Sequence, residues 1–505
     1  MTLSGLSRAV VEALVPYPSI VSCKFAQQQP DSGMHARPIR MEREKELLSL
    51  ERELSALLGS ESLRSGTDVE PYLHDSTEMQ GLRGHADAVV VPGSVEQVSQ
   101  LVEWCYTNGV PIVPRGGGTG FAGGCVPVEG GVVCSLERLN RVRQLVPDLW
   151  RMEVDAGVAT ARVQRLARES GLYYPPDPGA AEQSQIGGNI ACNAGGPHSF
   201  KYGTTSAWIT GVEAVVRNGQ LVRLGGPLRK DVAGYDLRSL MVGSEGTLGV
   251  ITGAWLRLIP APEASLAVVA GYPDAESGTA ALRRVLARGV TPATLEYFDR
   301  GCVAATRAAF PGGLPPDVGF LVISEADGTA NEAARIRDEL LQALGDGAVF
   351  LPVGRAVPAL RDLHRWRSGV SFAVSAQRGG KMSEDIAVPF EALETAISMV
   401  AKLQDVFGLP TCSWGHAGDG NLHATFMIDS TSVEEVRRAE AAADALFDGA
   451  LQMGGTVSGE HGLGWVKRHQ FDRQFSGNEA ALHRSIKLAF DPANLFNPGK
   501  KVSPQ

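Results

Sequence analysis

Two histidines stand seven residues apart in a glycine-rich stretch, SWGHAGDGNLHATF at 413–426. Each glycine there weakens a helix by roughly 1 kcal/mol relative to alanine, so one helix face carrying both His416 and His423 is not expected. An extended segment, a turn at 418–421 and a strand with its apolar residues on one face explain the pattern better. Such a turn can fold His423 back toward His416. A histidine pair by itself is as often structural as metal-binding, so it needs further support.

A second glycine-bracketed stretch, GGTVSGEHGLG at 454–464, adds an acid and a third histidine, Glu460 and His461. Two imidazoles and one carboxylate satisfy a divalent ion such as zinc or manganese and leave coordination positions open for a substrate. That arrangement is typical of a catalytic metal site rather than of a sealed structural one. An imidazole with a pKa near neutrality is also a suitable proton acceptor.

The composition is that of a globular protein with two or three domains. The chain has 505 residues, 44% of them hydrophobic and 20% charged, and this length exceeds what a single core usually serves. The formal net charge of −9, with scattered Lys and Arg, argues against a dedicated nucleic-acid binder. The 59 glycines exceed the usual share of about 7% and occur in clusters, which indicates loops that approach a ligand closely.

Cysteine usage and hydropathy bear on the compartment. Seven cysteines without CxxC spacing, and no signal peptide, predict reduced thiols in the cytoplasm and no iron–sulfur cluster within this chain. No stretch approaches the roughly 18 apolar residues of a membrane span, so we do not expect an integral membrane protein. Residues 1–40 are expected to be a disordered extension, or to precede a true start at Met41.

Periodicity and capping signals divide the rest of the chain into domains. A strand–helix–strand unit and a series of short strands make up a first domain predicted over 42–262. After the proline-rich segment 260–265, the order strand, helix, two strands, helix predicts a ferredoxin-like substrate domain over 263–453. A last segment covers 454–505, and no internal repeat is evident. The expected strands are 86–92, 110–114, 131–136, 151–155, 211–217, 220–224, 248–258, 265–271, 293–298 and 318–324, with a hairpin turn at 218–219, and the expected helices are 42–58, 94–109, 276–288, 331–345, 363–374, 432–453 and 479–490.

The loop PRGGGTGFAGGCVP at 114–127 formally matches the dinucleotide fingerprint in its run GTGFAG. A Rossmann site needs a helix that opens at this loop, and the glycines and prolines that follow cannot continue one. Residues without side chains still let backbone N–H groups surround a pyrophosphate, although a glycine hairpin without a ligand remains the alternative. Two further irregular stretches, 175–205 and 243–252, favour a ligand, because such segments inside a compact domain are usually functional.

Seven motifs occur in register between about residues 50 and 502: PRGGGTG, IGGNIACNAGG with KYG, VAGYDL, GSEGTLGVIT, GHAGDGNLH, SGEHGLG and NLFNPGK. Together they resemble the flavoprotein family of glycolate oxidase flavin subunits, D-lactate dehydrogenases and D-2-hydroxyglutarate dehydrogenases. The resemblance implies an α+β fold, with a vanillyl-alcohol-oxidase/PCMH-type FAD-binding domain and a ferredoxin-like substrate domain. It also implies a C-terminal helical segment that completes the active site and returns to the flavin domain.

The resemblance implies which residues hold FAD. The first loop would hold the pyrophosphate, the stretch 175–205 would line the flavin, and 243–252 would contact its nucleotide side, while Asn497 and Lys500 return to this domain. Some relatives tether the flavin through a histidine in the first loop. No histidine stands there here, so we predict non-covalent FAD, and Cys192 is expected to be a small buried thiol rather than a tether. The predicted FAD contacts are Arg115, Gly116, Gly117, Gly118, Thr119, Gly120, Gly123, Pro176, Asp177, Gly187, Gly188, Asn189, Asn193, Gly196, Tyr202, Gly203, Glu245, Gly246, Ile251 and Asn497.

The resemblance also assigns roles to the histidine motifs. The family residues that match His416, His423 and Glu460 bind a divalent metal, which implies zinc or manganese here, and the residue that matches His461 is the catalytic base. The chemistry supports this division, because a metal on a hydroxyl group lowers its pKa and a histidine can then accept the proton.

A cation is needed for the substrate carboxylate, and the predicted helix 363–374 offers one. Arg367 and Ser371 are four residues apart, on one helix face, and a guanidinium can grip a carboxylate through two hydrogen bonds. The resemblance gives this role to Arg367, with Ser371 where relatives often carry a hydroxyl group. Arg365 is the competing residue, and a solvated helix face is the alternative to both.

The reaction implied by the resemblance is the FAD-dependent oxidation of a small D-2-hydroxy acid, glycolate or D-lactate, to the 2-oxo acid. Relatives that act on 2-hydroxyglutarate place a lysine shortly before an Asp-x-x-x-Pro stretch. Here Lys381 stands four residues before Asp385 and Ser383 occupies the nearer position, which argues against a dicarboxylate substrate. D-2-Hydroxyglutarate dehydrogenase remains one alternative, and a non-catalytic flavin-binding subunit of an electron-transfer complex is another.

The electrons of the reduced flavin must leave the protein, because the chain carries no cluster or haem motif. The expected acceptor is an iron–sulfur companion subunit, a cytochrome, a quinone or an electron-transfer flavoprotein. The protein is expected in the cytoplasm, or at the membrane surface through such a partner.

Overall fold

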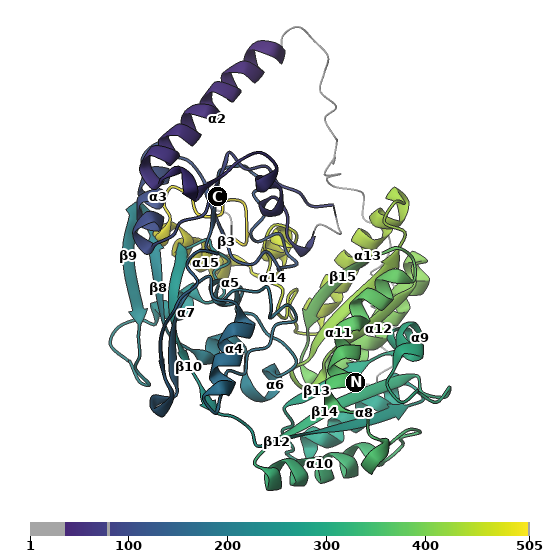
Figure 1. Ribbon diagram of the computed structural model, residues 1–505. Helices are drawn as coiled ribbons and strands as arrows, with labels where there is room; N and C mark the ends of the chain where they lie inside the picture. The colour runs from purple at the N-terminus through teal and green to yellow at the C-terminus, as the bar shows by residue number, and fades with distance from the viewer. Residues whose placement is uncertain (1–35, 78–80, 503–505) are drawn as a thin grey trace. The chain divides into compact units, whose positions relative to one another are not determined.

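The computed structural model of the chain describes residues 36–77 and 81–502 (Figure 1). The chain divides into two compact units, one up to Ser49 and one from Leu50 to the end. Helix α2, Ala36–Leu58, begins earlier than the helix predicted over 42–58, and most of the extension predicted over 1–40 lies outside the described residues. All other elements described below belong to the second unit.

A four-stranded sheet opens the second unit, in the order β1-β2-β4-β3. Strands β2, β4 and β3 are parallel, and α3 connects β2 to β3, so the predicted strand–helix–strand unit is confirmed. Ser94 Oγ accepts the Gln97 N–H at the start of α3, and Gly109, with φ of 66°, ends the helix. The bounds are β1 Leu63–Arg64, β2 Ala88–Val90, α3 Val95–Asn108, β3 Ile112–Arg115 and β4 Val132–Ser135.

A five-stranded antiparallel sheet follows, in the order β5-β6-β10-β8-β9. Strands β8 and β9 are joined at the predicted turn, where Asn218 and Gly219 both have positive φ, which these two residue types tolerate. Apolar residues of both sheets and of the helices between them form one core. The bounds are β5 Val142–Val146, β6 Arg151–Asp155, α4 Thr160–Glu169, β7 Leu172–Tyr173, α5 Ile186–Cys192, α6 Ser199–Tyr202, β8 Ile209–Val216, β9 Gln220–Gly225, α7 Leu237–Met241, β10 Val250–Arg257 and β11 Ile259–Pro260.

The third sheet has six antiparallel strands in the order β12-β14-β13-β16-β17-β15. The predicted order strand, helix, two strands, helix occurs once as β12-α8-β13-β14-α10 and again as β15-α12-β16-β17-α13, and the halves meet where β13 pairs with β16. The sequence shows no matching repeat, because equivalent elements need only share their apolar periodicity. The bounds are β12 Ala264–Tyr272, α8 Ala275–Ala287, β13 Thr294–Phe298, α9 Arg300–Thr306, β14 Phe320–Gly328, α10 Ala330–Gly345, α11 Leu360–Ala376, β15 Gly380–Ala387, α12 Leu393–Phe407, β16 Thr411–His416, β17 Asn421–Ile428 and α13 Val433–Gln452.

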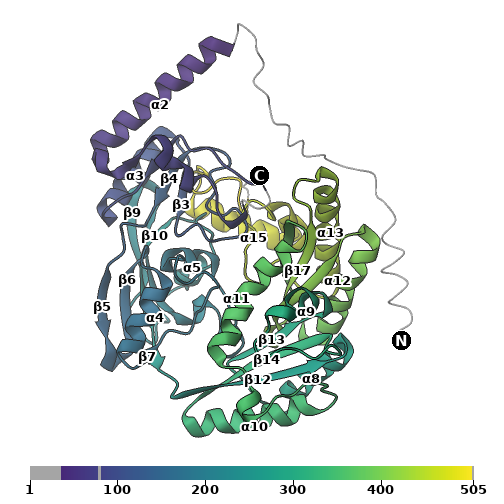
Figure 2. The same ribbon diagram turned by 45° about the vertical axis from the view of Figure 1, so that its right-hand side comes forward.

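The two faces of this sheet are covered differently (Figure 2). Helices α8, α10, α12 and α13 pack against one face and share an apolar core with it. Helices α9 and α11 pack against the other face, and their apolar core includes residues of β12, β14, β13 and β16. Polar side chains of β13, β16, β17 and β15 also lie on this second face, and they form the site described below.

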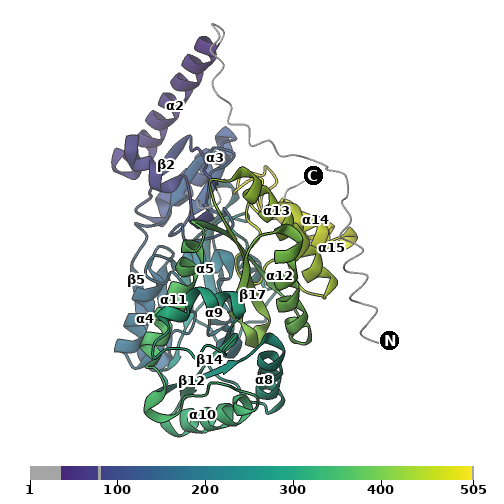
Figure 3. The same ribbon diagram turned by 90° about the vertical axis from the view of Figure 1, so that its right-hand side faces the viewer.

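The last segment of the chain returns to the first sheet, as predicted. The Ile112 N–H donates to Leu495 O and the Asn497 N–H to Ile112 O, so the chain end runs beside β3. Figure 3 shows α14, Phe471–Gln474, beside α13, and Arg473 pairs with Asp444 at 3.1 Å across these two helices. Helix α15 spans Gly477–Phe490. Within residues 36–77 and 81–502, no helix combines the length and the apolar character needed to cross a membrane.

Candidate functional site

A β-hairpin positions the two histidines. Strands β16 and β17 pair with Trp414 opposite His423, and the turn between them ends at Gly420, with φ of 75°. Strand β17 buries Leu422 and its alternate neighbours in the core that the sheet shares with α8, α10, α12 and α13. The two-residue period of a strand therefore places His423 on the opposite face. The rings of His416 and His423 lie 5.6 Å apart between centroids, at 88°. The predicted return of His423 toward His416 is therefore confirmed.

Glu460 reaches the same point from the loop that follows α13. Its Oε1 lies 3.3 Å from His423 Nε2 and 3.8 Å from His416 Nε2. One potential ligand atom from each of the three residues lies within 4.8 Å of the others. His416 Nε2 is buried without a hydrogen-bond partner among the described residues, and such an atom is costly unless something binds it. The donor set and the unpartnered nitrogen fit a divalent ion.

Glu296, on β13, contacts the His416 ring nitrogen that lies on the side away from Glu460. Its Oε1 lies 2.5 Å from His416 Nδ1, so this contact fixes the ring and leaves Nε2 directed at the three-residue cluster. Burial alone would lower the pKa of His416, but the Glu296 and Glu460 carboxylates outweigh it and raise this pKa to about 10. The pocket therefore favours positive charge at this imidazole, and a metal ion on Nε2 would supply that charge in place of a proton.

Sequence reasoning missed Glu296. Its signal was an acid in the middle of TLEYF, a strand that is otherwise almost entirely apolar and fully buried. A buried carboxylate in such a strand needs a partner. Its partners, His416 and Arg367, come from distant parts of the chain, so only the folded sheet identifies them.

His423 is suited to be a ligand for a different reason. Burial lowers its pKa to about 3, and the neighbouring His461 and His416 contribute in the same direction against the opposing effect of Glu460. This imidazole is therefore neutral at neutral pH and presents a lone pair without competition from a proton. Burial raises the pKa of Glu460, but the three histidines around it lower this pKa by more than burial raises it. The group is therefore an ionised carboxylate at neutral pH.

His461, the predicted base, lies beside the cluster and stacks on His423 with 5.4 Å between ring centroids. Its Nδ1 is 3.3 Å from Asp385 Oδ1, and its Nε2 is 3.8 Å from Glu460 Oε1. The exposed ring of Phe121 lies 4.8 Å from the His461 ring, between centroids. One nitrogen of His461 is thus oriented by a carboxylate, and the other faces the candidate metal position.

Asp385, on β15, organises the loop that carries Glu460 and His461. Its Oδ2 accepts the backbone N–H groups of Glu460 and His461, at 2.6 and 3.1 Å, and its Oδ1 pairs with buried Lys467 at 2.7 Å. Burial raises the pKa of Asp385, but His461 and Lys467 lower it well below the ordinary range. In the sequence, Asp385 stands at the start of an Asp-x-x-x-Pro stretch, but the stretch carries no indication of these contacts.

Replacing Asp385 with asparagine is expected to lower the free energy of unfolding by roughly 1.5–3 kcal/mol, because buried Lys467 would lose one of its two carboxylate partners and keep Glu384 at 3.1 Å. The depressed pKa of Asp385 means that its stabilisation is present at neutral pH and is lost as the pH falls below the unfolded value of about 3.9. Urea unfolding followed by circular dichroism measures the difference. Asp148, exposed in the 3-10 helix Pro147–Leu149, is the control, and its asparagine variant should change stability by less than about 0.5 kcal/mol. Equal stability of the Asp385 variant and the wild type at pH 7 would contradict this role.

Arg367 points to the histidine cluster, and Arg365 does not. Arg367 Nε donates to Glu296 Oε2 at 3.1 Å, and its terminal nitrogens have no partner among the described residues. Arg365 is exposed on α11. Ser371, one turn after Arg367, accepts a hydrogen bond from Lys381 Nζ at 2.5 Å. The predicted pair Arg367 and Ser371 therefore lies on the face of α11 turned toward the sheet.

The glycine loops of the first domain lie against one another. A Cβ on Gly117 would lie 2.1 Å from Gln183 O, and a Cβ on Gly116 would lie 3.4 Å from the Cα of Gly188. The backbone N–H groups of 116–121 donate no hydrogen bond to any other described residue. A row of unpaired amides beside a second glycine segment fits a pyrophosphate. This fit supports the prediction that FAD binds here.

Other predicted FAD contacts have side chains engaged within the protein. The Arg115 guanidinium donates to Pro71 O and His74 O, both at 2.8 Å, so its two terminal nitrogens are turned into the protein. Glu245 accepts the backbone N–H groups of Leu463 and Gly464. These contacts tie the glycine loops to the C-terminal segment.

The remaining predicted contacts lie as follows. Gly118, Gly123, Gly196, Gly203 and Gly246 have positive φ, Thr119 is partly buried, and Gly120 O accepts the Ser76 N–H. Gly187 N–H donates to Ala156 O, Asn189 Nδ2 to Thr160 Oγ1, and Asn497 Nδ2 to Gly124 O and Glu245 O. Pro176 O accepts from Gln164, Asp177 pairs with His198, Asn193 Oδ1 accepts from Thr204 and Ser206, Tyr202 donates to Asp327, and Ile251 is buried in the core.

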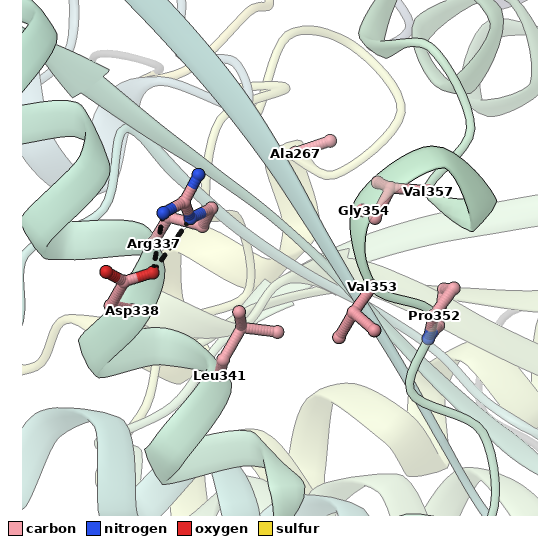
Figure 4. A pocket seen from close by; sticks show the side chains of 8 residues that line it. All are labelled: Ala267, Arg337, Asp338, Leu341, Pro352, Val353, Gly354 and Val357. Carbon is pink, nitrogen blue, oxygen red and sulfur yellow. Dashed lines mark hydrogen bonds and ion pairs between the residues drawn. The ribbon is translucent and has the colours of Figure 1, made fainter.

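A separate cavity, shown in Figure 4, has a volume of about 310 Å³ and is lined by residues of α10, β12 and 352–357. Its charged residues, Arg337 and Asp338, pair with each other at 2.7 Å. Strand β12 is at the edge of the sheet, three strands away from β16. This cavity is therefore not part of the histidine cluster.

Comparison with known proteins agrees with this layout. Residues 86–225 match the FAD binding domain family, and residues 261–501 match the family FAD linked oxidases, C-terminal domain. The chain is 34% identical to the glycolate oxidase subunit GlcD of Bacillus subtilis (strain 168), over 85% of this chain and 91% of the relative. It is 35% identical to the D-2-hydroxyglutarate dehydrogenase of Xanthomonas citri pv. viticola, over 90% of this chain and 96% of the relative.

Among solved structures, the fold resembles p-cresol methylhydroxylase with substrate bound, with a TM-score of 0.74 and 18% identity, over 92% of this chain and 97% of that chain. At this identity the likeness concerns the fold alone. It confirms the predicted α+β fold of the vanillyl-alcohol-oxidase/PCMH type.

Proposed function

Because the chain belongs to the FAD-linked oxidase family, we propose that it oxidises a small D-2-hydroxy acid to the 2-oxo acid and passes the electrons to an external acceptor. The observation that carries the proposal is the convergence of His416, His423, Glu460 and His461 next to the free guanidinium nitrogens of Arg367. Glycolate, D-lactate and D-2-hydroxyglutarate are the candidate substrates. The similarity to a glycolate oxidase subunit and to a D-2-hydroxyglutarate dehydrogenase supports this substrate class.

The residues divide the work as follows. Bound FAD would take the hydride from Cα, and a zinc or manganese ion held by His416, His423 and Glu460 would lower the pKa of the substrate hydroxyl. His461 Nε2 accepts the hydroxyl proton, since Asp385 engages Nδ1. The Asp385 carboxylate stabilises the imidazolium that results.

Arg367 binds the substrate carboxylate with its terminal nitrogens, while Glu296 holds its Nε. Glu296 also holds His416. The Glu296 carboxylate therefore sets the distance between Arg367 and His416. With its carboxylate on Arg367, the substrate would direct its hydroxyl group toward His461.

The flavin must be reoxidised by a partner. We propose an iron–sulfur companion subunit as the acceptor, with a cytochrome, a quinone or an electron-transfer flavoprotein as alternatives. A cytoplasmic protein, or one held at the membrane surface by that partner, would serve any of these acceptors.

Anaerobic mixing of the holoenzyme with D- and L-2-hydroxy acids tests the proposal. D-2-Hydroxy acids are expected to bleach the flavin absorption band at about 450 nm, because two-electron reduction of the flavin removes this band. A chelator is expected to suppress the bleaching. If no hydroxy acid bleached the flavin, the proposed oxidation would be contradicted. The chain would then be a flavin-binding subunit that does not turn over a hydroxy acid. Bleaching that a chelator does not affect would contradict the metal assignment only.

A further inference from the structure

The motif VAGYDL at 232–237 takes no part in the site described above. It lies in the loop between β9 and α7, where every residue from Pro227 to Leu237 is exposed. Figure 1 shows this loop projecting beside β9, the edge strand of the five-stranded sheet. Val232 and Tyr235 are 91% and 95% exposed, the highest values among the exposed large apolar side chains of the described residues. A single exposed apolar residue needs no explanation, but a group of them marks an interaction site.

The turn between β5 and β6 extends this apolar surface, because it exposes Leu149 and Trp150. Arg229 joins the turn to the loop, since its guanidinium lies over the Trp150 ring, 5.2 Å from the centroid. At the other end of the loop, Arg238 Nη1 donates to Ile209 O at 2.9 Å. The loop is therefore attached to the end of the sheet at two points.

The charges of this region are mostly basic and unpaired. Arg151 and Arg257 lie opposite each other on β6 and β10, an arrangement that is unfavourable for like charges. No carboxylate of the described residues lies within ion-pair distance of them, or of Arg229 and Lys230. We name residues 147–151, 226–238 and Arg257 the sheet-end surface. Its cations are Arg151, Arg229, Lys230, Arg238 and Arg257, and its acids are Asp148, Asp231 and Asp236, so it is net positive on a chain with a net charge of −9.

Two of the three acids are already engaged. Asp236 Oδ2 pairs with Arg238 at 2.8 Å, and its Oδ1 accepts the Ser239 N–H at the start of α7. Asp231 Oδ1 accepts the Ala233 N–H at 3.1 Å. The positive charge of the sheet-end surface therefore stays with the four unpaired cations.

This combination suits the headgroup region of an anionic membrane. Apolar and aromatic side chains can enter that region, where Tyr and Trp are enriched, while Lys and Arg beside them attract lipid phosphates. Val232 and Tyr235 occupy the tip of a loop, and a convex tip suits a deformable lipid surface. The charge of the sheet-end surface is complementary to that of anionic lipids, whereas the net charge of the chain is not.

We propose that the sheet-end surface binds the surface of a membrane that contains anionic lipids. Val232 and Tyr235 enter the headgroup region, and the four unpaired cations contact lipid phosphates. The chain then reaches the membrane through its own loop, without a partner subunit. This binding does not depend on the reaction proposed above.

Co-sedimentation of the FAD-loaded full chain with lipid vesicles tests the proposal. The wild type is expected to bind vesicles of phosphatidylcholine with about one-third phosphatidylglycerol, and to bind pure phosphatidylcholine at least about 10-fold more weakly. Val232→Ser combined with Tyr235→Ser should weaken binding to the anionic vesicles by at least about 10-fold, because binding scales with the apolar area buried in the interface. Val433→Ser combined with Leu482→Ser, at two exposed apolar positions outside this surface, is the matched control and should bind as the wild type does.

The cations are tested in the same assay. Arg229→Gln combined with Lys230→Gln should weaken binding by about 30-fold, since each cation near an anionic surface contributes about 5-fold. Lys402→Gln, at an exposed position of α12, should have little effect. The FAD content and the thermal unfolding midpoint of every variant should match the wild type, because all the substituted side chains are exposed.

A wild type that does not bind anionic vesicles, or variants that bind them as tightly as the wild type, would overturn the proposal. The first result, together with slower electron transfer to a protein acceptor in the Val232 and Tyr235 variant, would assign the sheet-end surface to that acceptor instead.

Discussion

Replacing His461 with asparagine is expected to slow flavin reduction by about 1,000-fold or more while FAD stays bound, because general-base catalysis contributes about 10²–10⁴-fold. His461 is the histidine whose Nδ1 is oriented by Asp385 and whose Nε2 faces Glu460 Oε1 at 3.8 Å. An asparagine amide can still donate to Asp385, so the loop should keep its course. It cannot accept the substrate proton at neutral pH.

Single-turnover stopped-flow under anaerobic conditions measures this effect without the electron acceptor. His469→Asn is the matched control, since His469 is an exposed histidine eight residues further on that contacts Gln470 and Asp444 instead. Its flavin should be reduced at the wild-type rate. Reduction of the His461 variant at the wild-type rate, with FAD content intact, would show that another group takes the proton.

Replacing His423 with alanine is expected to remove the bound divalent ion and to lower kcat/KM by about 1,000-fold or more, the effect of several kcal/mol of lost charge stabilisation. His423 is neutral, and its Nε2 is 3.3 Å from Glu460 Oε1, so it offers a lone pair to the candidate metal position. Without it, His416 and Glu460 would form a two-residue site that binds a metal weakly.

Elemental analysis of the purified protein reports this loss directly, beside the FAD content from absorbance. The wild type should hold about one zinc or manganese per chain, and the variant far less, with FAD retained because its predicted contacts lie in the first domain. Thr425→Ala, two residues along the same face of β17, is the control and should keep the metal. A metal content unaffected by loss of His423 would mean that the ion binds elsewhere.

The site could be predicted from sequence to the extent that its residues are neighbours in the chain or carry a motif. His416 and His423 belong to one hairpin, and the glycines that exclude a helix also indicate the turn that brings them together. Glu460 and His461 are adjacent. Arg367 and Ser371 follow from helical spacing.

The partners of these residues could not be found in this way. Glu296 meets His416 because β13 pairs with β16, at the junction of two structural halves that share no evident sequence repeat. Asp385 meets the loop at 458–467 because β15 pairs with β17 on the edge of the sheet. These pairings bring together residues more than seventy positions apart.

The sequence by itself determined the local elements, the glycine loops and the types of ligand, because backbone propensity, side-chain periodicity and donor chemistry act over a few residues. Only the tertiary structure decided which charges compensate one another and which do not. It pairs Lys467 with Asp385, leaves Lys381 without an acid, and turns Arg115 toward backbone carbonyls rather than toward a ligand. The physical reason is that the energy of a buried charge depends on the few atoms within hydrogen-bond distance, and strand order selects those atoms from the whole chain.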